Sequence, residues 1–215
     1  MSERGARGVP TTTASERTKI GTATAPRVPL IADGEVAEFD ALTAPLRDNG
    51  RPVPNLMRVM GRSPEFLRGW GVFSEAVRFG ISLPRGESEL VILRVSLLAG
   101  CRYSFAHHVP MALEHGITEE QLDALPEWST VDRFSARERA LLAAADGVVG
   151  GFDIGDEAFA ALSAHLPPEG VLEVVALASF YLSLGCIANS AGVPVDERVA
   201  PGLARYWRDV NMARR

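Results

Sequence analysis

The part of the chain that decides the fold is residues 86–116, which read GESELVILRVSLLAGCRYSFAHHVPMALEHG. A long apolar segment ends at Gly100, and a second helical segment follows directly, so we predict helices at 86–99 and 101–115. Strand signals, such as alternating Val, Ile and Thr closed by Asn-Gly or Asp-Gly, are almost lacking after residue 28. The sequence therefore predicts an all-α protein.

Helix starts are well marked elsewhere in the chain. Ser63 precedes Pro64, which places a capping residue before a proline at the first helical position. Thr118 and Ser135 each begin a capping box. We expect helices at 35–47, 54–61, 64–79, 86–99, 101–115, 119–124, 136–148, 156–165, 168–190 and 202–212.

The length of 215 residues suits one domain with its own core. Residues 1–28 differ from the rest, because they hold six Thr, few large apolar side chains, and five basic against two acidic residues. Such a segment cannot bury enough apolar surface to offset the entropy lost on ordering. We predict a flexible tail at 1–28 and a single domain at 29–215.

The composition excludes several classes of protein. A net charge of −5 gives no basic field for nucleic acid or a membrane surface, which disfavours a DNA-binding repressor. The apolar stretch Val171–Ala188 contains Glu173 and three further polar residues, so we expect a core helix and no membrane span. Two cysteines cannot form a disulfide scaffold, and the first ten residues lack a signal peptide's apolar core, so we expect a cytoplasmic protein.

Unusual residue types gather in the 86–116 segment, which holds three of the four histidines and one of the two cysteines. In a helix that starts near Cys101, the side chains of Cys101, Ser104 and His108 share one face within about 60°. The side chain of His107 points about 100° away from that of His108, so the two histidines cannot have the same role. A cysteine in the first turn of a helix faces free N–H groups and the positive end of the helix dipole, which favour the thiolate.

Glu89 lies twelve residues before Cys101, in the first turn of the preceding helix. If the two helices pack as a hairpin, its carboxylate reaches the same cavity with a raised pKa. His108 can take or give a proton near neutral pH. Each residue also has a structural interpretation, because cysteine is often a core residue and a first-turn glutamate often pairs only with the helix dipole.

These residues resemble the carboxymuconolactone decarboxylase family, which includes the AhpD-like alkylhydroperoxidases. The resemblance is carried by residues 89–94, 100–103 and 106–113, in which Glu89, Cys101 and His108 are spaced by twelve and seven residues. It covers roughly residues 50–195. It implies an AhpD-like all-α helical domain that assembles into homo-oligomers, as dimers, trimers or hexamers.

The resemblance also implies two kinds of activity. AhpD-like members reduce peroxides with a Cys-x-x-Cys pair and a Glu/His proton relay, whereas decarboxylase members remove CO2 from a small lactone acid without metal or organic cofactor. Cys101 matches the first thiol of the pair, and Ser104 stands at the position of the second. A hydroxyl cannot form a disulfide, so dithiol peroxidase chemistry is disfavoured.

We therefore expect a cofactor-independent, metal-free enzyme that uses Glu89, Cys101 and His108 on a small organic acid or lactone, by decarboxylation, isomerisation or ring opening. Arg94 or Arg85 could hold a substrate carboxylate as a bidentate pair. Two alternatives stay open: a one-thiol peroxidase that uses Cys101, a peroxide and an external reductant, and a non-catalytic all-α binding protein. The candidate substrate-binding residues are Tyr103, Ser104, His107 and Arg94.

Overall fold

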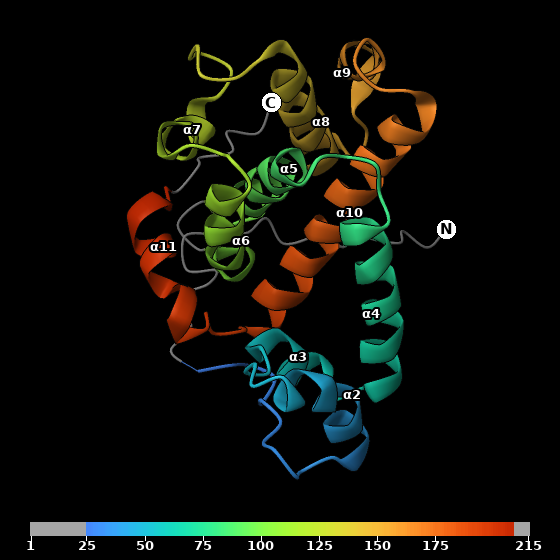
Figure 1. Cartoon of the computed structure of the whole chain (residues 1–215), viewed down its shortest axis with the longest axis vertical. Coiled ribbons are helices and arrows are strands. Elements are labelled where there is room, and N and C mark those ends of the chain that lie inside the picture. The colour runs from blue at the N-terminus through green and yellow to red at the C-terminus, as the bar shows by residue number, and fades with distance from the viewer. Residues whose placement is uncertain (1–24, 209–215) are drawn as a thin grey trace, which may run out of the picture.

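The computed structural model describes residues 25–208 of the chain. Within this range every regular element is a helix and no strand occurs, so the predicted all-α class is confirmed (Figure 1). The predicted tail lies outside the described residues except for its last four positions. There, the backbone N–H groups of Arg27 and Val28 donate to the carbonyl of Ala191 at 2.8 and 3.1 Å.

The helices follow the order that the sequence predicts, with boundaries that mostly agree within a few residues. They are α2 (Ala37–Asp48), α3 (Asn55–Met60), α4 (Pro64–Phe79), α5 (Arg85–Leu98), α6 (Arg102–Glu114), α7 (Glu119–Ala124), α8 (Ala136–Gly151), α9 (Gly155–Ser163), α10 (Pro168–Ala191) and α11 (Ala200–Tyr206), with 3-10 turns at Leu125–Glu127 and Glu197–Val199.

The predicted helix starts are present, with one difference. Thr118 and Ser135 both form complete capping boxes, at the start of α7 and α8. Ser63 precedes α4 as expected, with Pro64 in the first turn, but its side chain makes no capping hydrogen bond. The start of α4 therefore depends on the fixed backbone of the proline.

Two helix ends differ from the prediction. α11 ends at Tyr206, because Trp207 takes an extended backbone and packs its ring edge-on against Phe105. Residues 209–212, predicted in that helix, lie outside the described part of the chain. α8 runs past the predicted end to Gly151, and Phe152 takes the left-handed conformation with φ of 59° that a glycine more often supplies.

α5 lies at the centre of the molecule and packs against α6, α8 and α10. All ten residues from Ser88 to Leu97 are buried, so this helix is covered on every side. Its two faces belong to two separate core clusters. One cluster, shared with α8 and α10, includes Val91, Ile92 and Val95, and the other, shared with α6 and α11, includes Leu90, Leu93 and Leu97.

α10 is the longest helix and contacts α4, α5, α6, α8 and α9. Its length and composition would allow it to cross a membrane, but half of its most apolar window is buried inside the fold. This position agrees with the prediction of a core helix.

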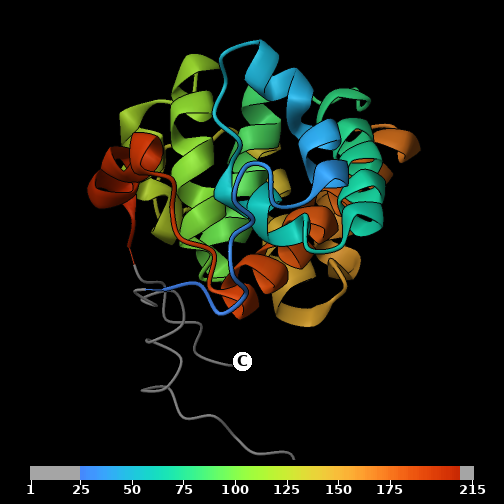
Figure 2. The same ribbon diagram turned by 90° about the horizontal axis from the view of Figure 1, so that it is seen from below.

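The segment before α2 crosses to α3 at the end of the molecule seen in Figure 2. There the N–H of buried Ile31 donates to the carbonyl of Arg58 at 3.1 Å.

Arg94 has a structural role, which corrects its prediction as a substrate ligand. Its guanidinium forms a bidentate ion pair with Asp146 of α8, with Nε–Oδ1 at 2.6 Å and Nη2–Oδ2 at 2.9 Å. Nη1 donates to the carbonyls of Leu125 and Pro126, both at 3.1 Å. Arg94 therefore joins α5 to α8 and to the 3-10 turn at Leu125–Glu127, and its donors are used within the core.

We expect Arg94→Met to lower the free energy of unfolding by about 3 kcal/mol, because Asp146 loses its cation and two carbonyls lose their donor. Urea unfolding followed by circular dichroism measures this change. The exposed Arg51 provides a control, and Arg51→Met should change stability by less than about 0.5 kcal/mol. A loss below about 1 kcal/mol for the Arg94 variant would contradict this role.

Candidate active site

The turn between α5 and α6 determines which residues of the two helices meet. Gly100 takes the left-handed conformation with φ of 63°, which glycine adopts without steric cost. Cys101 follows as the N-cap of α6. The chain therefore folds back as a hairpin, and the first turns of α5 lie beside the second turn of α6.

The hairpin brings Glu89 and His108 together. The Glu89 side chain is fully buried, and its Oε2 lies 2.6 Å from Nδ1 of His108. Its other oxygen, Oε1, lies 2.5 Å from Nη2 of Arg85, one turn earlier in α5. Arg85, which was predicted as a possible substrate ligand, is instead the counter-ion of the Glu89 carboxylate.

The charges of this pair follow from its surroundings. Burial lowers the pKa of His108, and this effect outweighs the support that Glu89 gives to the imidazolium. Burial also raises the pKa of Glu89, but His108, Arg85 and Arg78 together hold it below its ordinary value. The prediction of a raised pKa for Glu89 is therefore wrong. Near neutral pH, a neutral imidazole therefore donates its Nδ1–H to a carboxylate, and Nε2 keeps its lone pair.

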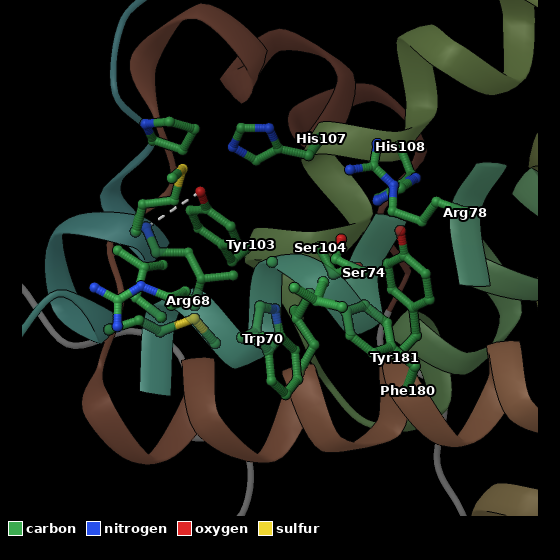
Figure 3. Close-up of a pocket in the computed structure, with 18 of the residues that line it drawn as sticks. Arg68, Trp70, Ser74, Arg78, Tyr103, Ser104, His107, His108, Phe180 and Tyr181 are labelled. Atoms are coloured by element: carbon green, nitrogen blue, oxygen red, sulfur yellow. Dashed lines mark hydrogen bonds between the residues drawn. The ribbon is translucent and has the colours of Figure 1, made fainter. Parts of the chain in front are cut away.

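A cavity of about 430 Å³ lies against this pair, enclosed mainly by α3, α4, α6 and α10 (Figure 3). One wall is formed by α6, which contributes four polar side chains. The opposite walls are largely apolar. The α6 residues are Tyr103, Ser104, His107 and His108, and the apolar walls include Leu56, Met57, Met60, Trp70, Phe180 and Leu184.

The structure separates Cys101 from the residues that line this cavity. Cys101 is completely buried, and its Sγ accepts a hydrogen bond from the backbone N–H of Ser104 at 3.4 Å. Burial raises the pKa of Cys101 to about 11, and the backbone hydrogen bonds of Ser104 and Tyr103 offset only part of this rise. The prediction of a thiolate at Cys101 is therefore wrong, because desolvation raises the pKa of the thiol by more than the helix N-terminus lowers it. Ser104, at the second thiol position of AhpD-like proteins, lines the cavity.

Tyr103 and His107 line the cavity at the end away from His108 (Figure 3). Asp196 holds both of them. The Oδ2 of Asp196 accepts from the Tyr103 hydroxyl at 3.0 Å and lies 2.7 Å from Nε2 of His107. The Tyr103 hydroxyl in turn accepts from the N–H of Leu56 at 3.3 Å. Burial and the charge of Asp196 raise the pKa of Tyr103, so this hydroxyl stays protonated.

Asp196, α4 and α10 also contribute to the site, and these contributions were not predicted from the sequence. Arg78 of α4 reaches toward His108, and the Tyr181 ring of α10 meets the His108 ring edge-on, with centroids 4.9 Å apart (Figure 3). Trp70 and Arg78 are eight residues apart, a spacing that puts them on one face of α4. That spacing was available in the sequence, but it does not say which element the face would meet.

A larger hollow of about 920 Å³ lies between α8, α9 and α10. Its walls are mostly apolar and include Phe152, Phe159 and Leu172, which are exposed to solvent. Cys186 lines it, but no histidine, glutamate or arginine does. We therefore place the candidate active site in the smaller cavity, where the titratable side chains gather.

Comparison with known proteins agrees with the resemblance seen in the sequence. Residues 64–147 match the model of the carboxymuconolactone decarboxylase family. This segment, about two fifths of the chain, is similar to that family. The uncharacterized protein YdfG of Bacillus subtilis (strain 168) is 27% identical over 96 residues, which are 44% of this chain and 65% of YdfG. The matched region thus spans slightly less than two thirds of that relative.

Solved structures of similar fold cover most of the described chain. The debrominase Bmp8, in its apo form, superposes with a TM-score of 0.69 at 19% identity, over 83% of this chain and 96% of Bmp8. A peroxidase-related protein from Ralstonia eutropha JMP134, described as an alkylhydroperoxidase AhpD core, gives a TM-score of 0.72 at 19% identity, over 83% and 96% of the two chains. At these identities the likeness establishes the AhpD-like fold.

The carboxymuconolactone decarboxylase match contains Arg78, Glu89, Cys101 and His108 but not the cavity residue Tyr181 or its neighbour Phe180. Asp196 also lies beyond it. The central pair of the site therefore lies in the matched segment, and part of the cavity wall comes from α10, beyond that segment.

The two thiols should differ sharply in reactivity, because Cys186 is exposed whereas Cys101 is buried with a raised pKa. We expect iodoacetamide to modify the native protein at Cys186 within minutes and to reach Cys101 only after unfolding. Intact-mass measurement of Cys186→Ser and Cys101→Ser variants assigns the modified residue. Rapid modification of the folded Cys186→Ser variant would show that Cys101 is accessible after all.

Proposed function

We propose that this protein is a carboxymuconolactone decarboxylase-like, cofactor-independent enzyme that transfers a proton on a small organic acid or lactone, in a decarboxylation, an isomerisation or a ring opening. The contact between Glu89 and His108 at the cavity wall supports this proposal most directly. A carboxylate that orients a histidine ring beside a cavity is an established arrangement for general acid–base chemistry.

His108 acts as the general base in this proposal. The Glu89 carboxylate accepts the Nδ1–H, which fixes the tautomer and leaves the Nε2 lone pair for the substrate. When Nε2 takes a proton, the imidazolium that forms is stabilised by the adjacent carboxylate. The imidazolium then returns the proton to another atom of the substrate, so that no net proton is gained or lost in an isomerisation.

The surroundings of the thiol favour this chemistry over the peroxidase alternative. A peroxidase needs a thiolate that peroxide can reach, whereas Cys101 is buried, has a raised pKa and does not line the cavity. The residue that faces the cavity at the second thiol position is Ser104. Its hydroxyl lies 2.8 Å from that of Ser96, whose own hydrogen is donated to the carbonyl of Ile92.

The proposed reaction draws on groups of this chain alone. Among residues 25–208, no group of three or more His, Cys, Asp or Glu side chains is arranged to hold a metal ion. A small organic acid or lactone as the substrate, a homo-oligomeric state and a cytoplasmic location stay predictions of the sequence.

We expect His108→Asn to lower kcat by about 10²-fold or more, because asparagine retains a polar side chain but cannot take the proton. A panel of small lactones and oxo acids, followed by proton NMR in D2O, detects loss of carbon-bound protons and release of products. His165→Asn is a matched control, since His165 is exposed and does not line the cavity. Wild-type turnover by the His108 variant on a compound that the enzyme converts would refute the proposal.

The pH profile tests the protonation state of the base. Because burial lowers the pKa of His108, the imidazole should stay neutral down to a pH below its ordinary value of about 6.5. For proton abstraction, kcat/KM should therefore rise with pH through a midpoint below about 6.5 and then level off. A rate that falls as pH rises through that midpoint would instead make imidazolium the reactive form, as in protonation of a carbanion after loss of CO2.

A further inference from the structure

The cavity end beside His108 carries one more positive than negative charge. The Glu89 carboxylate is paired with Arg85. None of the ion pairs within residues 25–208 includes Arg78, and its buried Nε has no hydrogen-bond partner. With a neutral His108, two guanidinium groups and one carboxylate remain at this end, so a single negative charge is missing.

Arg78 differs in this respect from the other arginine that lines the cavity. Arg68 forms ion pairs with Glu38 and Glu65, at 2.6 Å each, and its side chain is 45% exposed. Its charge is therefore already neutralised at the surface. Arg78 reaches inward over His108, where water screens its charge less (Figure 3).

Tyr181 provides a second unpaired polar group at the same place. The residue is 1% exposed and lines the cavity, and no hydrogen bond among residues 25–208 uses its hydroxyl. The hydroxyl points toward Arg78 and His108 (Figure 3). A cavity-lining hydroxyl that makes no hydrogen bond to these residues is available as a donor to a ligand that enters the cavity.

The remainder of the cavity selects the rest of the ligand. The Trp70 ring lies against Phe180, with centroids 4.5 Å apart, and Met57, Met60 and Leu184 complete an apolar surface. This surface can bury a flat or compact apolar body but offers no second cation free to bind another charge. The volume of about 430 Å³ lies within the range of small-molecule pockets.

We infer that Arg78 and the Tyr181 hydroxyl form an anion subsite, and that the cavity binds a small molecule with one anionic oxygen group at the His108 end and an apolar, ring-sized body against Trp70. As the specificity-determining residue, Arg78 holds the anion beside Nε2. The proton that His108 takes is then on an atom close to that group. This last step rests on the proposed function, whereas the binding of the anion does not.

Binding of two matched probes tests the subsite without a known substrate. Fluorine NMR titrations with 4-fluorobenzoate and its neutral analogue 4-fluorobenzamide give dissociation constants for the full-length protein. We expect the wild type to bind the carboxylate at least about tenfold more tightly than the amide. Arg78→Gln should weaken carboxylate binding about tenfold or more and leave amide binding within about twofold. Tyr181→Phe should weaken carboxylate binding by a smaller factor than Arg78→Gln does.

Arg68→Gln is the matched control, because it removes a guanidinium that also lines the cavity but is already paired. It should keep the preference for the carboxylate. Thermal unfolding checks that each variant is folded, and Arg78→Lys, which keeps the charge, should retain part of the preference. The inference is overturned if the wild type binds neither probe up to about 10 mM, binds both equally, or keeps its preference in the Arg78→Gln variant.

His108→Asn separates this inference from the proposed function. The variant should retain carboxylate binding, since asparagine leaves Arg78 and Tyr181 in place, whereas turnover is lost. Binding that depends on Arg78, together with turnover that does not need His108, would support the subsite and reject the acid–base proposal. Turnover that needs His108, together with carboxylate binding that does not depend on Arg78, would support the acid–base proposal and reject the subsite.

Discussion

The buried contact between Glu89 and His108 is the interaction on which the site depends. A carboxylate in the core is unfavourable unless other groups compensate its charge. Here Arg85 lies 2.5 Å from one oxygen and the His108 ring 2.6 Å from the other. The arrangement forms only if α5 and α6 pack as a hairpin with a fixed register, and the left-handed turn at Gly100 provides that register. The central helix of the fold is thus also the helix that carries the carboxylate.

The same hairpin explains why the site is better suited to proton transfer than to thiol chemistry. As the N-cap of α6, Cys101 directs its sulfur at the helix backbone, where Ser104 donates to it. The side chain three residues later faces the cavity, and in this chain it is a hydroxyl. Position 104, which faces the cavity, therefore carries no sulfur. The sulfur of Cys101 is buried away from solvent.

Much of the fold could be predicted from the sequence, because its signals are local. The capping boxes at Thr118 and Ser135 and the proline at position 64 define helix starts through contacts within one turn. Ends without such a signal were less predictable. α8 continues through two glycines, and a phenylalanine then takes the left-handed conformation. α11 ends where Trp207 packs on Phe105, a contact between residues far apart in the chain.

The sequence by itself determined the all-α class, the helix order and the spacing that places Glu89 and His108 on consecutive helices. Periodicity and capping are properties of neighbouring residues, so they can be read without coordinates. Only the tertiary structure decided that Arg94 would pair with Asp146 while Arg78 points into the cavity. Desolvation and ion pairing depend on which helices come together, and for that reason the protonation of Glu89, Cys101 and His108 could not be deduced from their positions in the chain.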